Sequence, residues 1–160
     1  MNLTPDTKQH HTATPYLIVA NAARAIEFYK NGFGAEESMR VADESGLVVH
    51  AEIVLGDSTI MLADEAPQWG RYSPTRVNGS PVHINLYVED SDAFVKRAVD
   101  AGAEVRIPVA DQFYGDRAGR ISDPFGHVWI VSTRKEDVPL DEMQRRLAAY
   151  MQNDGKGVQG

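Results

Sequence analysis

An internal repeat with a separation of about 69 residues is the feature that most restricts what this chain can fold into. Similar residues recur in the same order in the two halves, and self-similarity at one fixed separation indicates a supersecondary unit that is used twice. The corresponding positions are Val19 and Val88, Asn21 and Asp90, Gly34 and Gly102, and Gly56 and Gly126, at separations of 68 to 70 residues.

Each half of the repeat predicts a strand, a helix and then three more strands. Apolar runs at 16–20 and 82–88 are typical of buried strands, and Asn21 and Asp90 are suited to cap the helices that follow them. A unit of ~50 residues cannot bury both a helix and a sheet alone, so the halves should pack together. We therefore predict an α+β fold of two tandem βαβββ modules within residues 14–134. The modules are residues 14–66 and 82–133, joined by a linker at 67–81.

The segments outside the two modules predict two flexible tails and one helix. Residues 1–13 are polar and residues 153–160 are rich in glycine, so both are expected to be flexible. Residues 139–152 carry an apolar stripe at helical spacing, which is too large to leave in water. The stripe should therefore pack on its own domain or on a second copy of the chain, which favours a homodimer. It is formed by Leu140, Met143, Leu147 and Met151.

Composition excludes several classes of function. The chain of 160 residues has no cysteine, which rules out disulfides, thiolate metal sites and cysteine nucleophiles. Its net charge of −7 argues against a nucleic-acid partner, because phosphate binding needs clustered cations. No apolar run approaches the ~20 residues of a membrane span, and the polar start does not resemble a secretion signal. We expect a cytoplasmic protein that does not bind membranes.

Three short segments resemble a known superfamily when they are combined with the doubled βαβββ pattern. They are Ala25-Ile-Glu-Phe-Tyr29, Val82-His-Ile-Asn-Leu86, and Tyr114-Gly-Asp-Arg117 followed by Asp123-Pro-Phe-Gly-His-Val-Trp129. Over about residues 14–134 the chain resembles the vicinal oxygen chelate superfamily, which includes glyoxalase I, extradiol dioxygenases, fosfomycin-modifying enzymes and bleomycin-binding proteins. The motifs are most similar to its PhnB-like, glyoxalase/bleomycin-resistance branch. The resemblance implies that the two modules form a shared, cup-shaped cavity.

The same resemblance implies four positions for metal ligands, one on the first strand and one on the last strand of each module. Counting from the motifs places them at Thr14, Ile60, His83 and Ile130. Of these, only His83 offers a ligand that suits a catalytic divalent ion, and a single histidine does not hold one. We therefore expect no metal site and no cofactor, with a divalent metal as the alternative.

The alternation of side chains along a strand then predicts which residues share the face of these four positions. Tyr16, Asn85 and Tyr87 should line the cavity with His83, among apolar side chains such as Ile18 and Val128. Such a mixed lining is typical of a pocket for an organic ligand, although the same residues could instead fill a closed core. His83 is the candidate general base or ligand anchor, because imidazole exchanges protons near neutral pH; otherwise it is a histidine bonded to a neighbour.

Other candidate ligand-binding residues lie on loops and strand ends. His50 and Glu52 share one strand face and could point into the cup or form an exposed charge pair. Tyr114 and Arg117 precede the Asp123 turn, where a guanidinium such as Arg117 or Arg120 could anchor a carboxylate or fix the loop through Asp116. In the linker, Trp69 and Tyr72 could cover a ligand or pack on the other half. Trp129 alternates away from the cavity and should pack on a helix.

Three functions remain open at this point. The preferred interpretation is a PhnB-like protein that binds a small organic molecule in a cavity without a metal, and whether it also catalyses a reaction stays undecided. The first alternative is a metal-dependent lyase, isomerase or dioxygenase of the same superfamily. The second is a dimeric interaction subunit whose core is filled.

Overall fold

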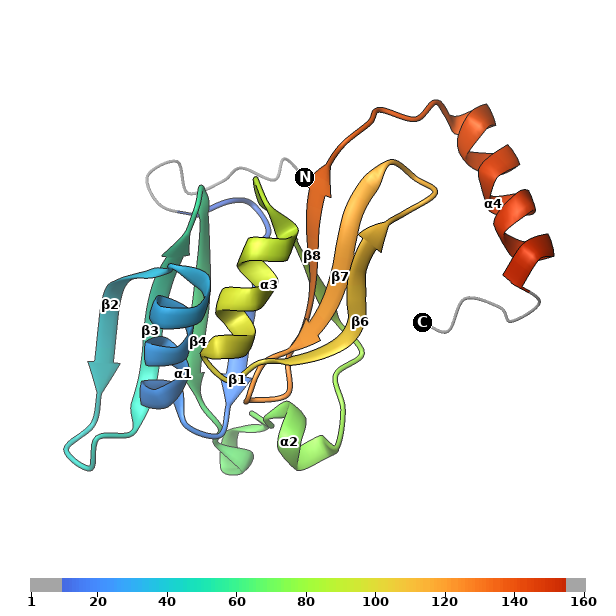
Figure 1. Ribbon diagram of the computed structural model, residues 1–160. Coiled ribbons are helices and arrows are strands. Elements are labelled where there is room, and N and C mark those ends of the chain that lie inside the picture. The colour runs from blue at the N-terminus through green and yellow to red at the C-terminus, as the bar shows by residue number, and fades with distance from the viewer. Residues whose placement is uncertain (1–9, 155–160) are drawn as a thin grey trace.

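Two four-stranded sheets with the same strand order form the computed structural model, which describes residues 10–154 (Figure 1). The first module contains β1 (Tyr16–Val19), α1 (Ala22–Phe28), β2 (Glu36–Ala42), β3 (Val48–Leu55) and β4 (Ser58–Asp64). The second contains β5 (His83–Tyr87), α3 (Ser91–Asp100), β6 (Glu104–Asp111), β7 (Asp116–Ser122) and β8 (Val128–Arg134). The sheets are ordered β1-β4-β3-β2 and β5-β8-β7-β6, so the predicted α+β fold of two βαβββ modules is confirmed.

The two helices begin at the residues that the repeat predicts. The Asn21 side chain accepts a hydrogen bond from the Arg24 backbone nitrogen, and the Asp90 side chain accepts one from the Ala93 backbone nitrogen, each at 3.0 Å. These bonds satisfy donors that have no partner inside a helix. After α1 the chain makes a π-helical turn, Tyr29–Phe33. This turn ends at Gly34, whose backbone is in the left-handed conformation.

The core lies where the helices of the two modules meet, and Figure 1 shows α1 and α3 side by side in front of the sheets. The ring of Phe33, from the π-helical turn, lies 5.1 Å from Phe94 of α3 and 5.0 Å from Trp129 of β8, measured between centroids. A Cβ atom on Gly32 would lie 3.0 Å from the Ala101 Cβ, so glycine permits this close approach. The modules therefore share one core, and Trp129 packs on its helical side as predicted.

Asp123 is a buried hydrogen-bonding centre within this core. One of its carboxyl oxygens, Oδ2, accepts from the Tyr29 hydroxyl at 2.6 Å and from Trp129 Nε1 at 2.8 Å. The other, Oδ1, accepts from the backbone nitrogens of Phe125 at 2.9 Å and His127 at 3.0 Å. Burial, and then the nearby Asp123, raise the pKa of Tyr29 well above its usual range, so this phenol stays protonated and donates. One side chain thus joins the π-helical turn after α1, the turn before β8, and β8 itself.

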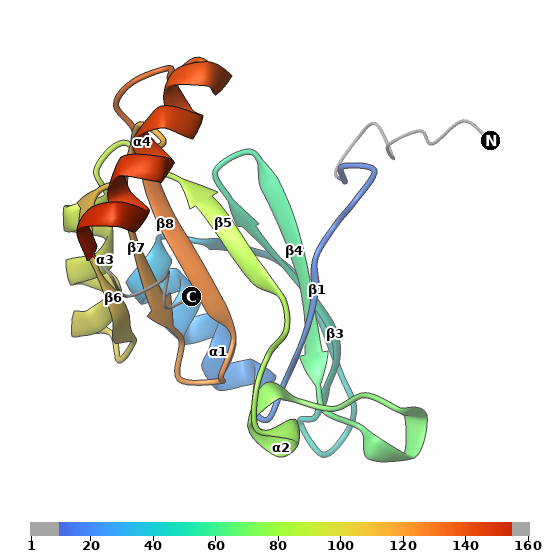
Figure 2. The same ribbon diagram turned by 90° about the vertical axis from the view of Figure 1, so that its right-hand side faces the viewer.

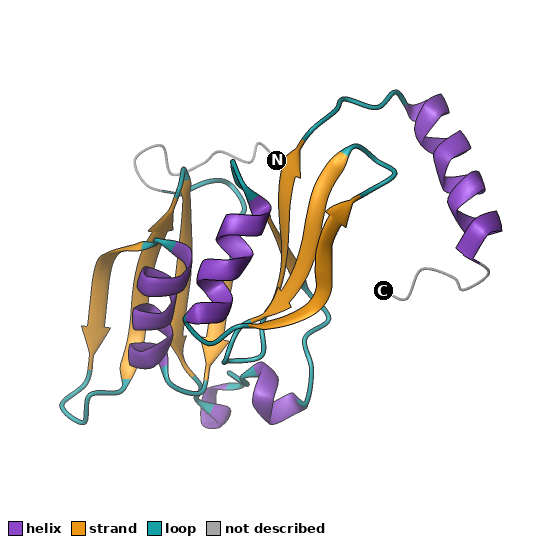
Figure 3. Cartoon of the chain, viewed as in Figure 1, coloured by secondary structure: helices purple, strands orange, loops and turns teal. Residues whose placement is uncertain are grey.

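The linker between the modules contains two short helices, whereas the sequence predicted a plain loop (Figure 3). They are a 3-10 turn at Pro67–Trp69 and α2 at Pro74–Val77. Proline stands in the first turn of each, where its missing N–H has no cost, and this explains why a proline-rich segment can be helical. Glu65 anchors α2, because its carboxylate accepts hydrogen bonds from the Ser73 hydroxyl and from Arg76 Nε, the latter at 3.1 Å.

Replacing Glu65 with glutamine should lower the melting temperature by a few degrees at neutral pH and should have almost no effect near pH 2. Hydrogen bonds from Arg76 and Ser73 lower the pKa of Glu65 from 4.5 to about 2. A group whose pKa is depressed by folding contributes stability above its unfolded pKa and loses it as the pH falls through its folded pKa. Melting curves of both proteins between pH 7 and pH 2 test this, and a difference that persists at the acid end would contradict it.

Figure 1 shows the C-terminal helix α4 (Leu140–Asp154) apart from the strands of both sheets. Its contacts include the Tyr150 ring, 6.0 Å from the ring of Phe113, and Arg146, which forms an ion pair with Glu136 at 2.9 Å. Leu140 is 71% exposed, so the apolar stripe is largely uncovered in the single chain. The expected homodimer stays a prediction. Among the described residues, no helix is both long and apolar enough to cross a membrane.

The predicted tails lie only in part within the described residues. Residues 1–9 and 155–160 are outside them. Of the rest of the first tail, His10 lies 3.1 Å from the Glu52 carboxylate, and His11 Nε2 lies 2.9 Å from the Asp57 carbonyl oxygen. Residues 10 and 11 are therefore tied to the first sheet by hydrogen bonds.

Candidate functional site

The sheet face of the second module that points away from α3 carries the candidate residues His83, Asn85 and Tyr87. Trp129 and Val131 of β8 point into the helical core, so the alternate residues of β8 lie on the opposite face. Strand pairing arranges this face in three rows across β5, β8 and β7. The rows are His83–Val128–Ser122, Asn85–Ile130–Arg120 and Tyr87–Ser132–Ala118. The structure thus places His83, Asn85 and Tyr87 on one face with Ile130, in agreement with the alternation of the sequence.

A cavity of about 410 Å³ opens on this face, which we call the second-module cavity. Ile130 and Ser132 line it from β8, and Asn85 and Tyr87 line it from β5. Tyr114 comes from the β6–β7 loop. The remaining lining residues are Asp116, Arg134, Asp137, Val138 and Met143, the last of which belongs to α4. A volume of this size suits a small organic molecule.

Hydrogen bonds hold one wall of the second-module cavity in place. Arg134 donates from Nε to Asp116 at 2.6 Å and from one terminal nitrogen to the Tyr87 hydroxyl at 3.1 Å. The guanidinium also lies over the Tyr87 ring, 5.4 Å from its centroid. Hydrogen bonds to Tyr87, Asp137 and Asp116 raise the pKa of Arg134, so its guanidinium stays protonated and paired with the two carboxylates.

Tyr114 and Asn85 present polar groups to the same space. Burial, with the nearby carboxylate of Asp116, raises the pKa of Tyr114, so its phenol is a neutral donor at physiological pH. The Asn85 side-chain oxygen accepts a hydrogen bond from the Ser132 hydroxyl at 3.0 Å. This bond orients the amide, and its NH₂ group has no hydrogen-bond partner among residues 10–154.

A second hollow, of about 950 Å³, lies between the edge strands β1 and β5 of the two modules, and we call it the inter-module groove. Tyr16, Tyr72 and His83 line it, and Asn85 lines both the groove and the second-module cavity. His127 Nε2 lies 3.0 Å from the Ile18 carbonyl oxygen and so links the two modules beside the groove. His127 is partly buried at this position. Figure 2 shows β5 between β8 and the strands of the first module.

In the first module, the predicted cavity face is wrong by one residue at β4. The parallel pairing places Tyr16 opposite Met61, so Met61 shares the face of Tyr16. Ile60 is 2% exposed and belongs to the helical core, with Leu62 on the same side. The superfamily position predicted at Ile60 therefore falls at Met61. The four positions then carry a hydroxyl, a thioether, an imidazole and an alkyl group.

His50 and Glu52 lie on the sheet face of the first module in a chain of hydrogen bonds. The Tyr16 hydroxyl lies 2.9 Å from His50 Nδ1, and His50 Nε2 lies 3.2 Å from Glu52 Oε1. His10 Nε2 lies 3.1 Å from the same Glu52 oxygen. Glu52 is buried, so it can hold both imidazoles in a fixed orientation. His50 and Glu52 line neither hollow, and only Tyr16 connects this chain to the groove.

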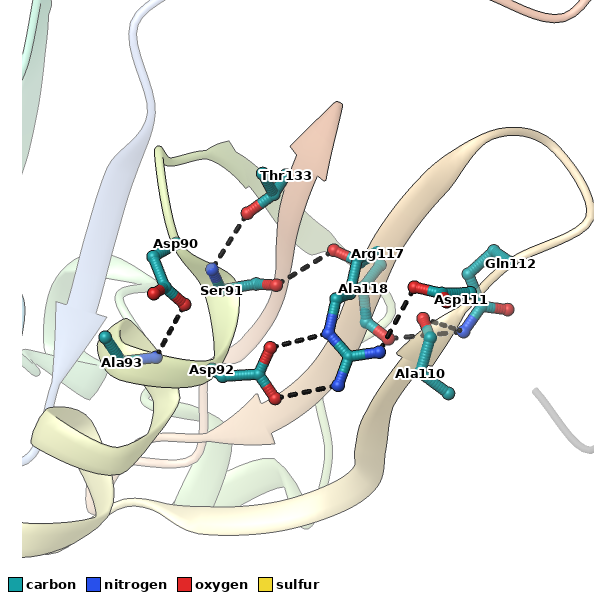
Figure 4. Close-up of polar contacts among 10 residues, drawn as sticks. All are labelled: Asp90, Ser91, Asp92, Ala93, Ala110, Asp111, Gln112, Arg117, Ala118 and Thr133. Carbon is teal, nitrogen blue, oxygen red and sulfur yellow. Dashed lines mark hydrogen bonds and ion pairs between the residues drawn. The ribbon is translucent and has the colours of Figure 1, made fainter. Parts of the chain in front are cut away.

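Two other predicted ligand-binding residues lie away from both hollows. Arg117 is on the opposite face of β7 from Asp116, and its Nε donates to Asp92 of α3 at 2.6 Å (Figure 4). A second ion pair, at 3.1 Å, joins Arg117 to Asp111. Arg117 therefore ties α3 to the sheet instead of facing a cavity. Trp69 is 65% exposed, and the Arg71 guanidinium lies 5.0 Å from its ring centroid.

The sequence reasoning missed Arg134, Val138 and Met143 as cavity residues. The first could have been found, because Arg134 continues the alternation of Val128, Ile130 and Ser132 along β8. Met143 could not have been found, because the periodicity of a helix does not tell which part of the protein the helix lies next to. The described residues contain no group of three or more histidine, aspartate or glutamate side chains arranged to hold a metal ion.

Comparisons with known proteins agree with this architecture. The sequence profile of the Glyoxalase/Bleomycin resistance protein/Dioxygenase superfamily matches residues 8–131. The uncharacterized protein Mb0911c of Mycobacterium bovis is 41% identical over 145 residues, which cover 89% of this chain and 94% of that protein. The uncharacterized protein At5g48480 of Arabidopsis thaliana is 34% identical over 119 residues, 69% of this chain and 70% of that protein.

Solved structures show the same fold. The crystal structure of the At5g48480 product aligns with a TM-score of 0.62 and 31% identity, covering 75% of this chain and 96% of the other. TioX from Micromonospora aligns with a TM-score of 0.61 and 21% identity, covering 78% and 99%. The fosfomycin resistance protein FosX of Listeria monocytogenes, solved with Mn(II), aligns with a TM-score of 0.59 and 19% identity, covering 84% and 95%. At such identities the last two are evidence of a shared fold alone.

Proposed function

Because the chain belongs to the Glyoxalase/Bleomycin resistance protein/Dioxygenase superfamily, we propose that it binds a small organic molecule in the second-module cavity without a metal ion, in the manner of the PhnB-like branch. The observation that carries the proposal is the cavity itself, about 410 Å³ in volume. It combines an apolar floor at Ile130 with polar groups from Asn85 and Tyr114, which is the usual composition of a ligand pocket. A filled core is disfavoured, because this volume exceeds that of a few water molecules at ~30 Å³ each.

The donor chemistry of the superfamily positions argues against a resident metal. Of Thr14, Met61, His83 and Ile130, one side chain is an imidazole, and none is a carboxylate that would balance the charge of a divalent ion. The thioether of Met61 is a soft ligand that suits Cu(I) better than Zn, Ni or Mn. These four side chains therefore do not fit a catalytic divalent ion, and the polar residues of the cavity are suited to binding a ligand.

In a thermal-shift screen, small organic molecules should raise the melting temperature, and Asn85→Ala should abolish the increase. A ligand at 100 times its Kd adds about 2.7 kcal/mol of stability, which is a shift of several degrees for a domain of this size. Asn85 is the residue to change because it lines the second-module cavity as well as the inter-module groove. Addition of Mn²⁺, Ni²⁺ or Zn²⁺ should leave the melting temperature unchanged.

The matched control is Asn31→Ala, an exposed asparagine that lines neither hollow, which should keep the full ligand shift. Metal analysis of the purified protein separates the main alternative. A stoichiometric divalent ion that is lost in His83→Ala would contradict the proposal and would favour a metal-dependent lyase, isomerase or dioxygenase. A screen in which no organic molecule shifts the melting temperature would also contradict it.

A further inference from the structure

We infer that the second-module cavity selects an anionic ligand, a small organic acid whose carboxylate is bound by Arg120. The inference rests on the proposed function and names the class of molecule that the site accepts. Arg120 lies on β7, opposite Ile130 of β8, which is in turn opposite Asn85 of β5. Ile130 and Asn85 both line the cavity, and Arg120 is the third residue of their row, next to the lining residues on the same sheet face.

Arg120 has a buried donor without an acceptor. Its Nε atom is buried and has no hydrogen-bond partner, and within residues 10–154 no carboxylate forms an ion pair with its guanidinium. A buried donor that loses its water costs free energy until an acceptor reaches it. A guanidinium is always protonated, so the acceptor that compensates it best is an anion.

The other arginines of the same sheet do have partners, which sets Arg120 apart. Arg117 binds Asp92, and Arg134 binds the buried Asp116 at 2.6 Å. Arg106 donates to the Ser122 hydroxyl at 2.8 Å. Asp116 and Asp137, the two carboxylates that line the cavity, therefore both pair with Arg134, and Arg120 is left without an ion-pair partner among the described residues.

Two other polar groups of the cavity, on Asn85 and Tyr114, can also donate hydrogen bonds. The Asn85 side-chain oxygen accepts a hydrogen bond from the Ser132 hydroxyl, and the amide NH₂ group is available as a donor. Tyr114 keeps its proton, because burial and the neighbouring Asp116 raise its pKa. Arg120 is close enough to the Tyr114 hydroxyl to oppose part of that shift by its charge. Three donors lie on one face, and one of them is a guanidinium without an ion-pair partner among the described residues. This set matches a carboxylate, which accepts hydrogen bonds only and can bind a guanidinium through both oxygens.

Benzoate and its neutral isostere benzamide test the inference in NMR titrations of the full chain. Benzoate should shift backbone amides of β5, β7 and β8 and should bind at least about 10-fold more tightly than benzamide, since hydrogen bonds to charged groups are worth that factor or more. Arg120→Gln should weaken benzoate binding by about the same factor and leave benzamide binding unchanged. The variant should fold, because it removes a buried donor that has no partner.

The control variant is Arg40→Gln, which removes the same charge from β2 of the first module and should not change benzoate binding. If both probes bind equally well, or if Arg120→Gln binds benzoate like the wild type, the inference is overturned while the proposed function stands. If neither probe shifts the amides of β5, β7 and β8, the inference is overturned as well. The proposed function is then judged by whether the thermal-shift screen finds any ligand.

Discussion

Replacing Asp123 with alanine is expected to lower the free energy of unfolding by about 3–5 kcal/mol, a large part of the ~5–15 kcal/mol that keeps a domain folded. The substitution would leave the Tyr29 hydroxyl, the Trp129 indole N–H and the backbone N–H groups of Phe125 and His127 buried without their acceptor. Each such group costs about 1–3 kcal/mol when it loses its partner in the interior, unless water replaces it. Urea denaturation followed by tryptophan fluorescence measures the loss.

Asp123→Asn separates the acceptor chemistry from the shape of the side chain. The amide has nearly the same size, but its NH₂ group would face a donor on one side of the site, so much of the loss should remain. Asp43→Ala is the matched control, because Asp43 also organises a turn by accepting from Ser45 and Leu47, but in an exposed position. The control should cost less than about 1 kcal/mol. Equal losses at Asp43 and Asp123 would contradict the role assigned to the buried site.

Replacing Phe33 with alanine is expected to cost about 3–5 kcal/mol and to destabilise both modules together. Phe33 is 4% exposed, and its ring contacts the first module through Phe28 and the second module through Phe94 and Trp129. Removing it leaves a cavity in the core that the modules share, and this cavity cannot collapse without moving one helix against the other. Denaturation followed by circular dichroism and by fluorescence should give one coincident transition at a lower urea midpoint.

Trp69→Ala is the control for removing an aromatic ring, because Trp69 is mostly exposed and lies in the linker. Its effect should be within about 0.5 kcal/mol, as for most surface substitutions. Two separate transitions in Phe33→Ala would show that the modules unfold independently. A small effect would show that the core is divided between the modules instead of shared.

The sequence allowed the fold to be predicted because the evidence for it is local. The caps at Asn21 and Asp90, the glycine after each helix and the strand alternation each follow from a few neighbouring residues, and the repeat confirmed each by a second copy. The helices within the linker were not predicted, because residues such as Pro67 and Pro74 are also typical of loops. Proline is equally compatible with the first turn of a helix, where it stands here.

The error at Ile60 has a physical cause in the lengths of two turns. The first module closes β3 and β4 by a two-residue turn between Leu55 and Ser58, whereas five residues separate Ser122 from Val128 in the second. Gly56 and Gly126 therefore do not hold equivalent positions in the two turns, and a count that aligns them places the β4 position at Ile60, one residue before Met61. A shift of one residue moves every side chain of a strand to the other face. Only the pairing of Tyr16 with Met61 decides which face is correct.

The sequence by itself determined the two-module fold, the equivalent cap residues of the two helices, and the sheet face that His83, Asn85 and Tyr87 share. These features depend on short-range patterns along the chain. The tertiary structure alone decided which charges find partners. Arg117 and Arg120 are three residues apart on β7, and sequence cannot rank them as ligand anchors. Strand alternation in the folded sheet turns Arg117 toward Asp92 of α3 and places Arg120 in the row of Asn85, where its buried donor has no acceptor among the described residues.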